Sequence, residues 1–267
     1  MNAGAERLEA AFAGSGKRAA LMPYMMAGFP GFDVSLEIGR ACARAGADII
    51  ELGVAFSDPL ADGPVIHAAG TRALAAGSTI DRVLALAGAL TAEVPVVLMC
   101  YANPILARGV EPFAQALDEA GISGLIVPDL PLEEGLEVQA ACETAGVALV
   151  PLVAPTTTDE RLRSIGARAR GFLYAVSVTG TTGERRALAA TFGPLVARAR
   201  RHTAVPVAVG FGIGTPEQAV AAAQAGADGV IVGSRLVRAA GEAEDPAAAV
   251  GELVAAFADA LAVPAPV

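Results

Sequence analysis

The sequence predicts an α/β fold, a (β/α)8 TIM barrel that forms a single domain with an extra N-terminal helix. Three observations lead to this prediction. An Ala-Gly junction between a helix and an apolar strand returns along the chain, eight strand candidates follow in order, and 267 residues is a usual length for such a barrel. Strands that are apolar on both faces are typical of parallel strands covered by helices.

The repeated junction has the same form in four places. It occurs in "ARAGADIIELG" (Ala43–Gly53), "DEAGISGLIVP" (Asp118–Pro128), "ETAGVALVPLV" (Glu143–Val153) and "AQAGADGVIVG" (Ala223–Gly233). Glycine is expected directly after a helix, where the backbone φ angle is positive. Each junction therefore predicts the end of one helix and the start of the next strand. This is a repeated βα unit and not a series of hairpins.

The remaining elements complete the barrel in chain order. The extra helix is expected at Ala5–Ala13, before the first strand. Short apolar runs predict strands at Ala20–Met26, Asp48–Gly53, Val96–Cys100, Gly124–Val127, Ala148–Val153, Gly171–Val176, Val207–Gly210 and Gly229–Val232. Helical patterns follow them, for instance at Asp33–Arg44, Ile80–Leu90, Glu133–Thr144, Asp159–Ala169, Pro216–Ala225 and Pro246–Leu261.

A doubly wound parallel sheet is the alternative architecture. Its dinucleotide-binding fingerprint would follow the first strand, but "MAGFPGF" does not have the GxGxxG pattern. No break in composition suggests a linker, so we expect one domain over residues 1–267.

Composition and charge argue against several classes of protein. Hydrophobic residues make up 54% of the chain and charged residues 18%, which excludes a disordered protein. The net charge of −9 argues against a nucleic-acid or membrane-surface binder. The basic run "RARRH" (Arg198–His202) is interpreted as a solvated helix end. The N-terminus lacks the apolar region of a signal peptide, and no apolar run approaches the ~20 residues that span a bilayer.

The three cysteines point to a reducing compartment. Cys42, Cys100 and Cys142 are far apart and lie in apolar surroundings, which favours reduced core thiols over a disulfide or zinc framework. We therefore expect a cytoplasmic protein.

Site residues of a barrel of this kind lie at the carboxyl ends of the strands and in the loops that follow. The loop after the second strand, "ELGVAFSDPLADGP" (Glu51–Pro64), contains three carboxylates. The loop after the sixth strand, "SVTGTTGERR" (Ser177–Arg186), is rich in Gly and Thr, and the last two strands end in "VGFGIGTPEQ" (Val209–Gln218) and "VIVGSRL" (Val230–Leu236).

The last two of these loops predict a phosphate site. Gly210, Gly212 and Gly214 allow a close approach of the backbone, and Thr215-Pro216-x-Gln218 has the form of a capping box at a helix start. Gly233 and Ser234 are placed to open another short helix. Amides at helix N-termini bind phosphate without Lys or Arg, and these two loops form the usual phosphate cradle of the fold. The alternative is that the glycines only form tight turns.

Missing residue types narrow the chemistry. Lys17 is the only lysine and lies before the first strand, which argues against a Schiff-base aldolase or a PLP enzyme in this chain. His67 and His202 are the only histidines, which argues against a His-rich metal site. The carboxylates remain as the main candidates for proton or carbon chemistry.

Spacing alone leaves the roles of the three acids open. Glu51 ends a strand, and burial at the barrel mouth would raise its pKa into the range of a general acid–base. A salt-bridged or solvated strand end is the alternative for Glu51. Asp58 and Asp62 precede Pro59 and Gly63, which is also ordinary turn chemistry.

The sequence closely resembles the tryptophan synthase α subunit family over nearly the whole chain. The resemblance is carried, in order, by "ELGVAFSDPLADGPVI", "YANP" (Tyr101–Pro104), "VPDLP" (Val127–Pro131), "SVTGTTG" (Ser177–Gly183), "GFGI" (Gly210–Ile213) and "VGS" (Val232–Ser234). It implies a TIM barrel that cleaves indole-3-glycerol phosphate to indole and glyceraldehyde 3-phosphate. In this retro-aldol reaction the indole C3 gains a proton, the adjacent hydroxyl loses one, and the C–C bond breaks.

The resemblance also implies roles for individual residues. Glu51 matches the catalytic glutamate, and Asp62 matches the carboxylate that pairs with the indole N–H. Thr182 belongs to a lid over Asp62, within a loop (Val178–Arg186) expected to be mobile without ligand. Substrate-lining residues are implied at Tyr24, Ile66, Met99, Tyr174, Phe211 and Ile231, and phosphate contacts at Gly183, Gly212, Gly233 and Ser234.

The family's usual partner is a PLP-bearing β subunit in an α2β2 complex that receives indole. PLP is therefore expected in the partner and no cofactor in this chain. Asp58 and Asn103-Pro104 match segments that face that partner. The chain departs from common family residues at Met26, Ala55, His67 and Arg235.

Two other functions are possible on this barrel. A phosphosugar isomerase or cyclase would use carboxylates on the first and fifth strands, and neither "ALMPYMM" nor "ALVPLV" contains one. A barrel without activity, kept to activate a partner, is the non-enzymatic alternative.

Overall fold

Parallel strands form the wall of the barrel. The computed structural model describes residues 2–176, 185–210 and 212–263, and within them the strand order is β5-β4-β3-β2-β1-β9-β8-β7-β6. The strands are β1 (Ala20–Met26), β2 (Ile50–Gly53), β3 (Val96–Met99), β4 (Gly124–Ile126), β5 (Ala148–Val150), β6 (Leu152–Val153), β7 (Leu173–Val176), β8 (Val207–Gly210) and β9 (Gly229–Val232). The predicted barrel is confirmed.

The fifth strand is divided in two by a proline. β5 pairs with β4, and β6 pairs with β7, so the two halves together join the ends of the sheet. Pro151 lies between them and has no N–H to donate, but its carbonyl accepts a hydrogen bond from Tyr174 N at 3.0 Å. The prediction of one unbroken strand at Ala148–Val153 is therefore wrong at this residue.

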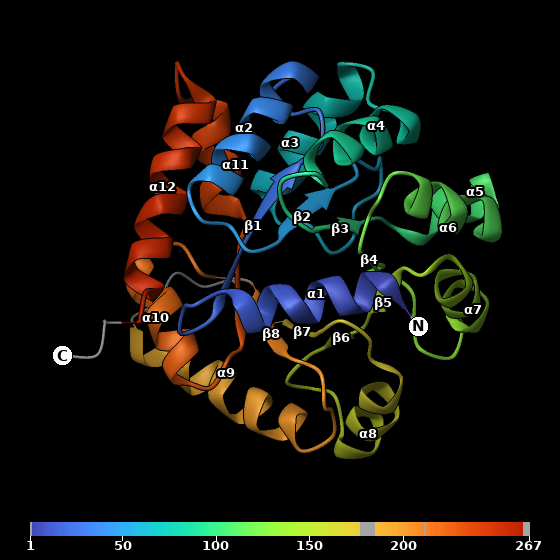
Figure 1. The fold of residues 1–267 in the computed structure, drawn as a ribbon, viewed down its shortest axis with the longest axis vertical. Coiled ribbons are helices and arrows are strands. Elements are labelled where there is room, and N and C mark those ends of the chain that lie inside the picture. Colours follow the sequence, from blue (N-terminus) through green and yellow to red (C-terminus); the bar gives the residue numbers. More distant parts are fainter. Residues whose placement is uncertain (1, 177–184, 211, 264–267) are drawn as a thin grey trace.

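Helices surround the strands (Figure 1). Those of the first half are α1 (Ala3–Gly14), α2 (Phe32–Arg44), α3 (Pro64–Ala75), α4 (Ile80–Leu90), α5 (Ala102–Arg108) and α6 (Val110–Glu119). Those of the second half are α7 (Leu136–Ala145), α8 (Asp159–Arg168), α9 (Arg185–Arg200), α10 (Pro216–Gln224), α11 (Ser234–Glu242) and α12 (Pro246–Leu261).

Local hydrogen bonding explains where boundaries differ from those predicted. β2 begins at Ile50 and not at Asp48, because the Asp48 carboxylate accepts from Leu21 N at 2.7 Å and holds the chain at the strand entrance. α7 begins at Leu136 and not at Glu133, because residues 131–134 form a turn closed by Glu134 N and Pro131 O at 3.1 Å.

The glycines of the repeated junctions have the predicted conformation. Gly46, Gly121, Gly146 and Gly226 follow helices α2, α6, α7 and α10, with φ angles of 97°, 70°, 73° and 98°. An L-side chain rarely adopts this region, so glycine ends each helix and directs the chain into the next strand.

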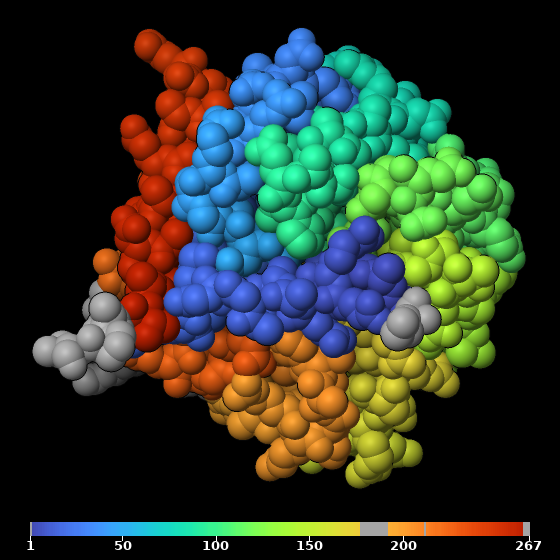
Figure 2. Space-filling view, in the orientation of Figure 1, coloured from blue at the N-terminus to red at the C-terminus, as the bar shows by residue number. Residues whose placement is uncertain are grey.

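Helix α1 closes the amino-terminal end of the barrel, where it lies across the strands (Figures 1 and 2). Leu8 is fully buried, and added Cβ atoms at Gly124 and Gly171 would lie 3.1 and 2.7 Å from its Cδ1 atom. Lys17 forms an ion pair with Asp48 at 2.8 Å near the same end. The only lysine is therefore far from the carboxyl ends of the strands, where catalysis is expected.

Among the described residues, no single helix is both long and apolar enough to cross a membrane. α3 and α4 reach that length and composition only as a pair, across a bend of 110°.

Candidate active site

Glu51 is a buried acid on β2. Its side chain is 1% exposed, and its Oε2 atom has no hydrogen-bond partner among the described residues. Burial raises its pKa to about 8, and the nearby Asp62 carboxylate adds to the shift. A carboxyl group with this pKa exchanges protons near neutral pH, as a general acid–base requires.

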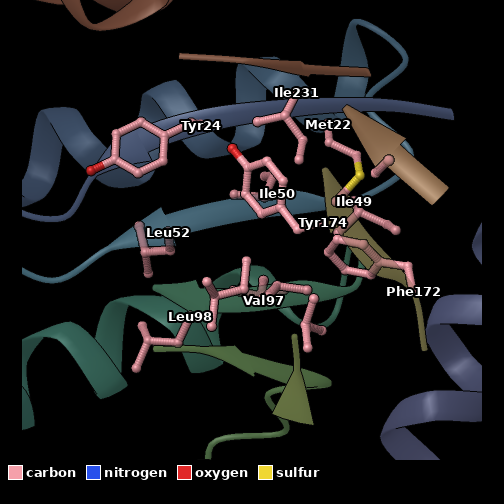
Figure 3. Close-up of a cluster of buried hydrophobic side chains, with 14 of the residues drawn as sticks. Met22, Tyr24, Ile49, Ile50, Leu52, Val97, Leu98, Phe172, Tyr174 and Ile231 are labelled. Carbon is pink, nitrogen blue, oxygen red and sulfur yellow. The ribbon is translucent and has the colours of Figure 1, made fainter. Parts of the chain in front are cut away.

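Two tyrosines form walls beside Glu51. Tyr24 on β1 is in register with Glu51 across the strand pair, and Tyr174 lies on β7 (Figure 3). An added Cβ at Gly53 would collide with the Tyr24 hydroxyl, and one at Gly210 would collide with the Tyr174 hydroxyl. The glycines at these strand ends therefore make room for the rings. Burial and the Glu51 charge both contribute to raising the pKa of each phenol, so both remain protonated at neutral pH.

Asp62 lies in the turn before α3 and is half-buried. Burial raises the pKa of its carboxyl group, while a hydrogen bond from Tyr101 and the charge of His67 oppose the increase. The Tyr101 hydroxyl donates to Asp62 Oδ1 at 3.0 Å. The two acids therefore have different environments: Glu51 has an unpartnered oxygen in an apolar setting, whereas Asp62 receives a hydrogen bond.

The sequence prediction missed Tyr101 as a site residue. It is 3% exposed, lies two residues after the end of β3, and is the N-cap residue of α5. Its position after a barrel strand is the signal that could have identified it, since site residues gather there. Its ring also stacks on Phe56, with 5.3 Å between centroids and an interplanar angle of 28°.

The other predicted lining residues are distributed around the same end of the barrel. Ile231 is buried on β9, while Met99 at the end of β3 and Ile66 on α3 are half-buried. Thr182, Gly183 and Phe211 lie outside the described residues, as does most of the predicted lid at 178–186.

The two predicted phosphate-binding helix starts differ in their free donors. At α10, Gly214 N and Thr215 N donate to Gln218 Oε1 at 2.8 and 3.2 Å, and Gln218 N donates to Thr215 Oγ1 at 3.3 Å. The predicted capping box is confirmed, and it uses these donors internally.

Helix α11 begins differently. Its N-cap, Gly233, has no side chain to cap the helix, and among the described residues no acceptor contacts the amides of Ser234 and Arg235. Free amides at the positive end of a helix dipole attract an anion. Gly233 also adjoins Tyr24: an added Cβ there would lie 3.6 Å from the Tyr24 Cβ. The open helix start is therefore next to the barrel mouth, and Gly212, with φ of 79°, lies on the neighbouring loop.

Metal-ligating side chains are not grouped in the described part of the chain, where no set of three His, Cys, Asp or Glu residues could hold a metal ion.

The groups at the barrel mouth suit proton transfer by Glu51, charge stabilisation by Asp62, and the binding of an apolar ring and an anion.

A separate cavity of about 360 Å³ lies beside α7 and α8. It is lined by Leu130, Leu152 and Arg161, among others, and Arg161 is already paired with both carboxylate oxygens of Glu133 at 2.8 Å. We assign the site to the barrel mouth because Glu51 and Asp62, two carboxylates with raised pKa values and no ion-pair partner among the described residues, lie near each other there, whereas Asp48, whose pKa burial also raises, is paired with Lys17.

Comparisons with known proteins agree on one family. Residues 11–263 match the family described as "Tryptophan synthase alpha chain". The tryptophan synthase alpha chain of Methanosarcina mazei is 52% identical over 229 residues, covering 86% of this chain and 84% of that protein. The one of Carboxydothermus hydrogenoformans is 53% identical over 220 residues, covering 82% of each. The solved structure of tryptophan synthase subunit alpha from Legionella pneumophila superposes with a TM-score of 0.86 at 38% identity, covering 98% of both chains.

Proposed function

Because this chain belongs to the tryptophan synthase alpha chain family, and is therefore a lyase that cleaves indole-3-glycerol phosphate, we propose that Glu51 and Asp62 perform the reaction. The observation that carries this proposal is the pairing of a buried acid, whose pKa is about 8, with a second carboxylate at the same barrel mouth. Environments that separate the pKa values of two acids assign them different roles.

Glu51 is the proton-transfer group in this proposal. It accepts the proton of the glycerol hydroxyl next to the indole and supplies a proton to the indole C3. The C–C bond then breaks, its electron pair returns to the ring, and the products are indole and glyceraldehyde 3-phosphate. A carboxyl group that is protonated and ionised in comparable amounts near neutral pH can act in both directions.

Asp62 accepts the indole N–H and stabilises the positive charge that the ring acquires when C3 is protonated. Its hydrogen bond from Tyr101 favours the ionised form, as this role requires. Stabilisation of a developing charge by a fixed, partly dehydrated group is worth several kcal/mol in enzymes, about 3 kcal/mol for one donor.

The substrate is held between apolar walls and an anion site. Tyr24, Met99, Tyr174 and Ile231 form the indole slot, and the start of α11 at Gly233 and Ser234 binds the phosphate. Gly183 and Gly212 contribute from the neighbouring loops, Ile66 and Phe211 extend the slot, and Thr182 belongs to a lid over Asp62.

Glu51→Gln tests the proposal. The amide keeps the shape of the side chain but cannot transfer the proton, so kcat for indole release should fall by at least about 100-fold. Binding of glyceraldehyde 3-phosphate, measured by calorimetry, should stay within about threefold because the helix start is unchanged. Turnover of the variant within tenfold of the native protein would remove Glu51 from the mechanism.

We further propose that the chain forms an α2β2 complex with a β subunit that carries PLP and receives indole. Two large apolar side chains support this surface: Leu60, 91% exposed, follows Asp58, and Leu106, 61% exposed, lies on α5 with Asn103 and Pro104. Exposed apolar groups of this kind are typical of interfaces. The reaction's place in amino-acid biosynthesis supports a cytoplasmic location.

Leu60→Asp tests the surface. Sedimentation with the β subunit should show at least a tenfold weaker complex, whereas Leu136→Asp, at a residue 57% exposed on α7, should not weaken it. Equal affinities for both variants would place the partner elsewhere.

A further inference from the structure

Tyr101 is connected to both ends of the loop between β2 and α3. Its hydroxyl donates to Asp62 Oδ1 at 3.0 Å and accepts from Ala61 N at 3.0 Å. Its ring stacks on Phe56, at the start of the loop. One buried side chain that follows β3 therefore contacts residues near both ends of the loop between β2 and α3.

The loop has few other connections. Ser57 Oγ donates to Asp58 at 2.7 Å and Asp62 N donates to Pro59 O at 3.2 Å, so these bonds stay within the loop. Within the described residues, the hydrogen bonds that join residues 57–62 to other segments both end on the Tyr101 hydroxyl. Without that oxygen, the Asp62 carboxylate loses its hydrogen bond to another segment, and only packing, the bond within the loop and the charge of His67 act on its position.

Tyr101 is in turn held by the next strand end. Ala102 N, the first amide of α5, donates to Asp129 Oδ1 at 2.9 Å. Asp129 follows β4 and supplies the acceptor that the N-cap Tyr101 lacks, since Tyr101 makes no side-chain cap of its own. The contacts run from the end of β4 through the start of α5 to the end of the β2 loop.

We propose that Tyr101 is a positioning residue for the cleavage reaction, which fastens the β2–α3 loop and aims the Asp62 carboxylate, and that Asp129 holds Tyr101 in place. This inference rests on the role of Asp62 proposed above. It adds a function for two residues outside the proposed catalytic pair, Glu51 and Asp62.

The pH dependence of the rate separates positioning from a general effect on folding. Removing the hydroxyl takes a hydrogen bond from the Asp62 carboxylate, so the pKa of Asp62 rises and the acid limb of the rate profile moves to higher pH. The titratable groups that act on Asp62 in the described structure are Glu51 on β2, Tyr24 on β1, Tyr101 and His67 on α3. Only the contact from Tyr101 changes in a Tyr101→Phe variant.

The test measures indole release against pH for the native protein, Tyr101→Phe and Asp62→Asn. Phe keeps the stack on Phe56 and removes both hydrogen bonds. We expect kcat to fall about tenfold, as the loss of one hydrogen bond to a charged group predicts, with the acid limb shifted upward. We also expect faster hydrogen exchange at the Ala61 amide. A native rate and pH profile in Tyr101→Phe would overturn the inference.

Asp62→Asn separates the two proposals. Full activity in Asp62→Asn would exclude the proposed role of Asp62 in the reaction, on which this inference rests. An inactive Asp62→Asn beside a native-like Tyr101→Phe would exclude only the positioning role of Tyr101.

Asp129 provides a second, graded test in the same assay. Asp129→Ala should lower kcat about threefold or more and accelerate exchange at the Ala102 amide, while Asp129→Asn keeps an oxygen acceptor and should restore most of the rate. Glu134→Ala is the matched control, because it removes an exposed acid from the same loop and should change neither quantity. Equal losses in Asp129→Ala and Asp129→Asn would exclude the acceptor role.

Discussion

Glu51 is a carboxylic acid buried within β2, two residues before the strand ends and not at its end as the sequence suggested, and burial changes both its chemistry and its effect on stability. In the folded protein burial raises the pKa of Glu51 to about 8, whereas the unfolded chain releases this proton near the ordinary glutamate value of 4.5. Above that lower value the unfolded state binds fewer protons than the folded state, so stability falls as pH rises through the window between the two values. A buried acid of this kind therefore lowers the free energy of unfolding near neutral pH, where its proposed proton transfer takes place.

Glu51→Gln should therefore stabilise the protein in a pH-dependent way. The amide cannot ionise, so the variant should be more stable than the native protein by more than about 1 kcal/mol at about pH 8.5 and nearly equal to it at about pH 4.5. Urea unfolding at the two pH values measures the difference. A pH-independent difference would mean that Glu51 does not hold a raised pKa in the fold.

Helices α10 and α11 both follow barrel strands but differ in the backbone donors that their starts leave free. α10 begins after a glycine-rich loop that follows β8, whereas the single residue Gly233 separates α11 from β9. The capping box of α10 occupies the donors at its start, whereas the start of α11 keeps the amides of Ser234 and Arg235 free among the described residues. Internal capping favours stability, and open amides favour an anion.

Thr215→Ala and Ser234→Ala should therefore affect different quantities, the first the stability of the protein and the second its KM. Loss of the Thr215 cap should lower the free energy of unfolding by about 1 kcal/mol and leave KM for indole-3-glycerol phosphate unchanged. Loss of the Ser234 hydroxyl should raise KM about tenfold with little change in stability, because a donor to a charged group is lost. Denaturation curves and steady-state kinetics on both variants measure these two effects. A large increase of KM in Thr215→Ala would assign phosphate binding to the start of α10 instead.

In the whole molecule, the residues that close the barrel and the proposed site residues lie at opposite ends of the strands. Helix α1, Leu8 and the Lys17–Asp48 ion pair lie at the amino-terminal ends of the strands, while Glu51 and the start of α11 lie at the carboxyl ends. This division is usual for the fold, in which the first end carries stability and the second carries catalysis.

Leu8→Ala tests that division. Its fully buried side chain packs beneath the strands, so its truncation should cost about 2–5 kcal/mol in urea unfolding. At a temperature where the variant remains folded, kcat and KM should match the native values. Glu9→Ala, at an exposed position on the same helix, should change neither stability nor kinetics by a measurable amount. A changed kcat in folded Leu8→Ala would show that the two ends are coupled.

Much of the fold could be predicted from local patterns. β1, β8, β9, α4 and α12 have the predicted bounds, because apolar runs and helix starts are properties of short segments. The four glycines after helices were predicted for the same reason, since positive φ is a local requirement. The order of strands and helices then left few ways to close a barrel of this length.

The barrel could be predicted from the sequence alone, because its elements depend on local periodicity. The choice of the strand-end loops as the site, and of carboxylates as its chemical groups, follows from which residue types are present and stays a prediction. Three features became visible only in the folded protein: Pro151 divides a strand, Glu51 is buried with an oxygen that has no partner among the described residues, and Tyr101 bonds to Asp62 across 39 residues of chain. The tertiary structure also decided which helix start keeps its donors free. The physical reason is that burial and hydrogen-bond partners are set by neighbours in space, and segments distant in the chain supply those neighbours only after the barrel has closed.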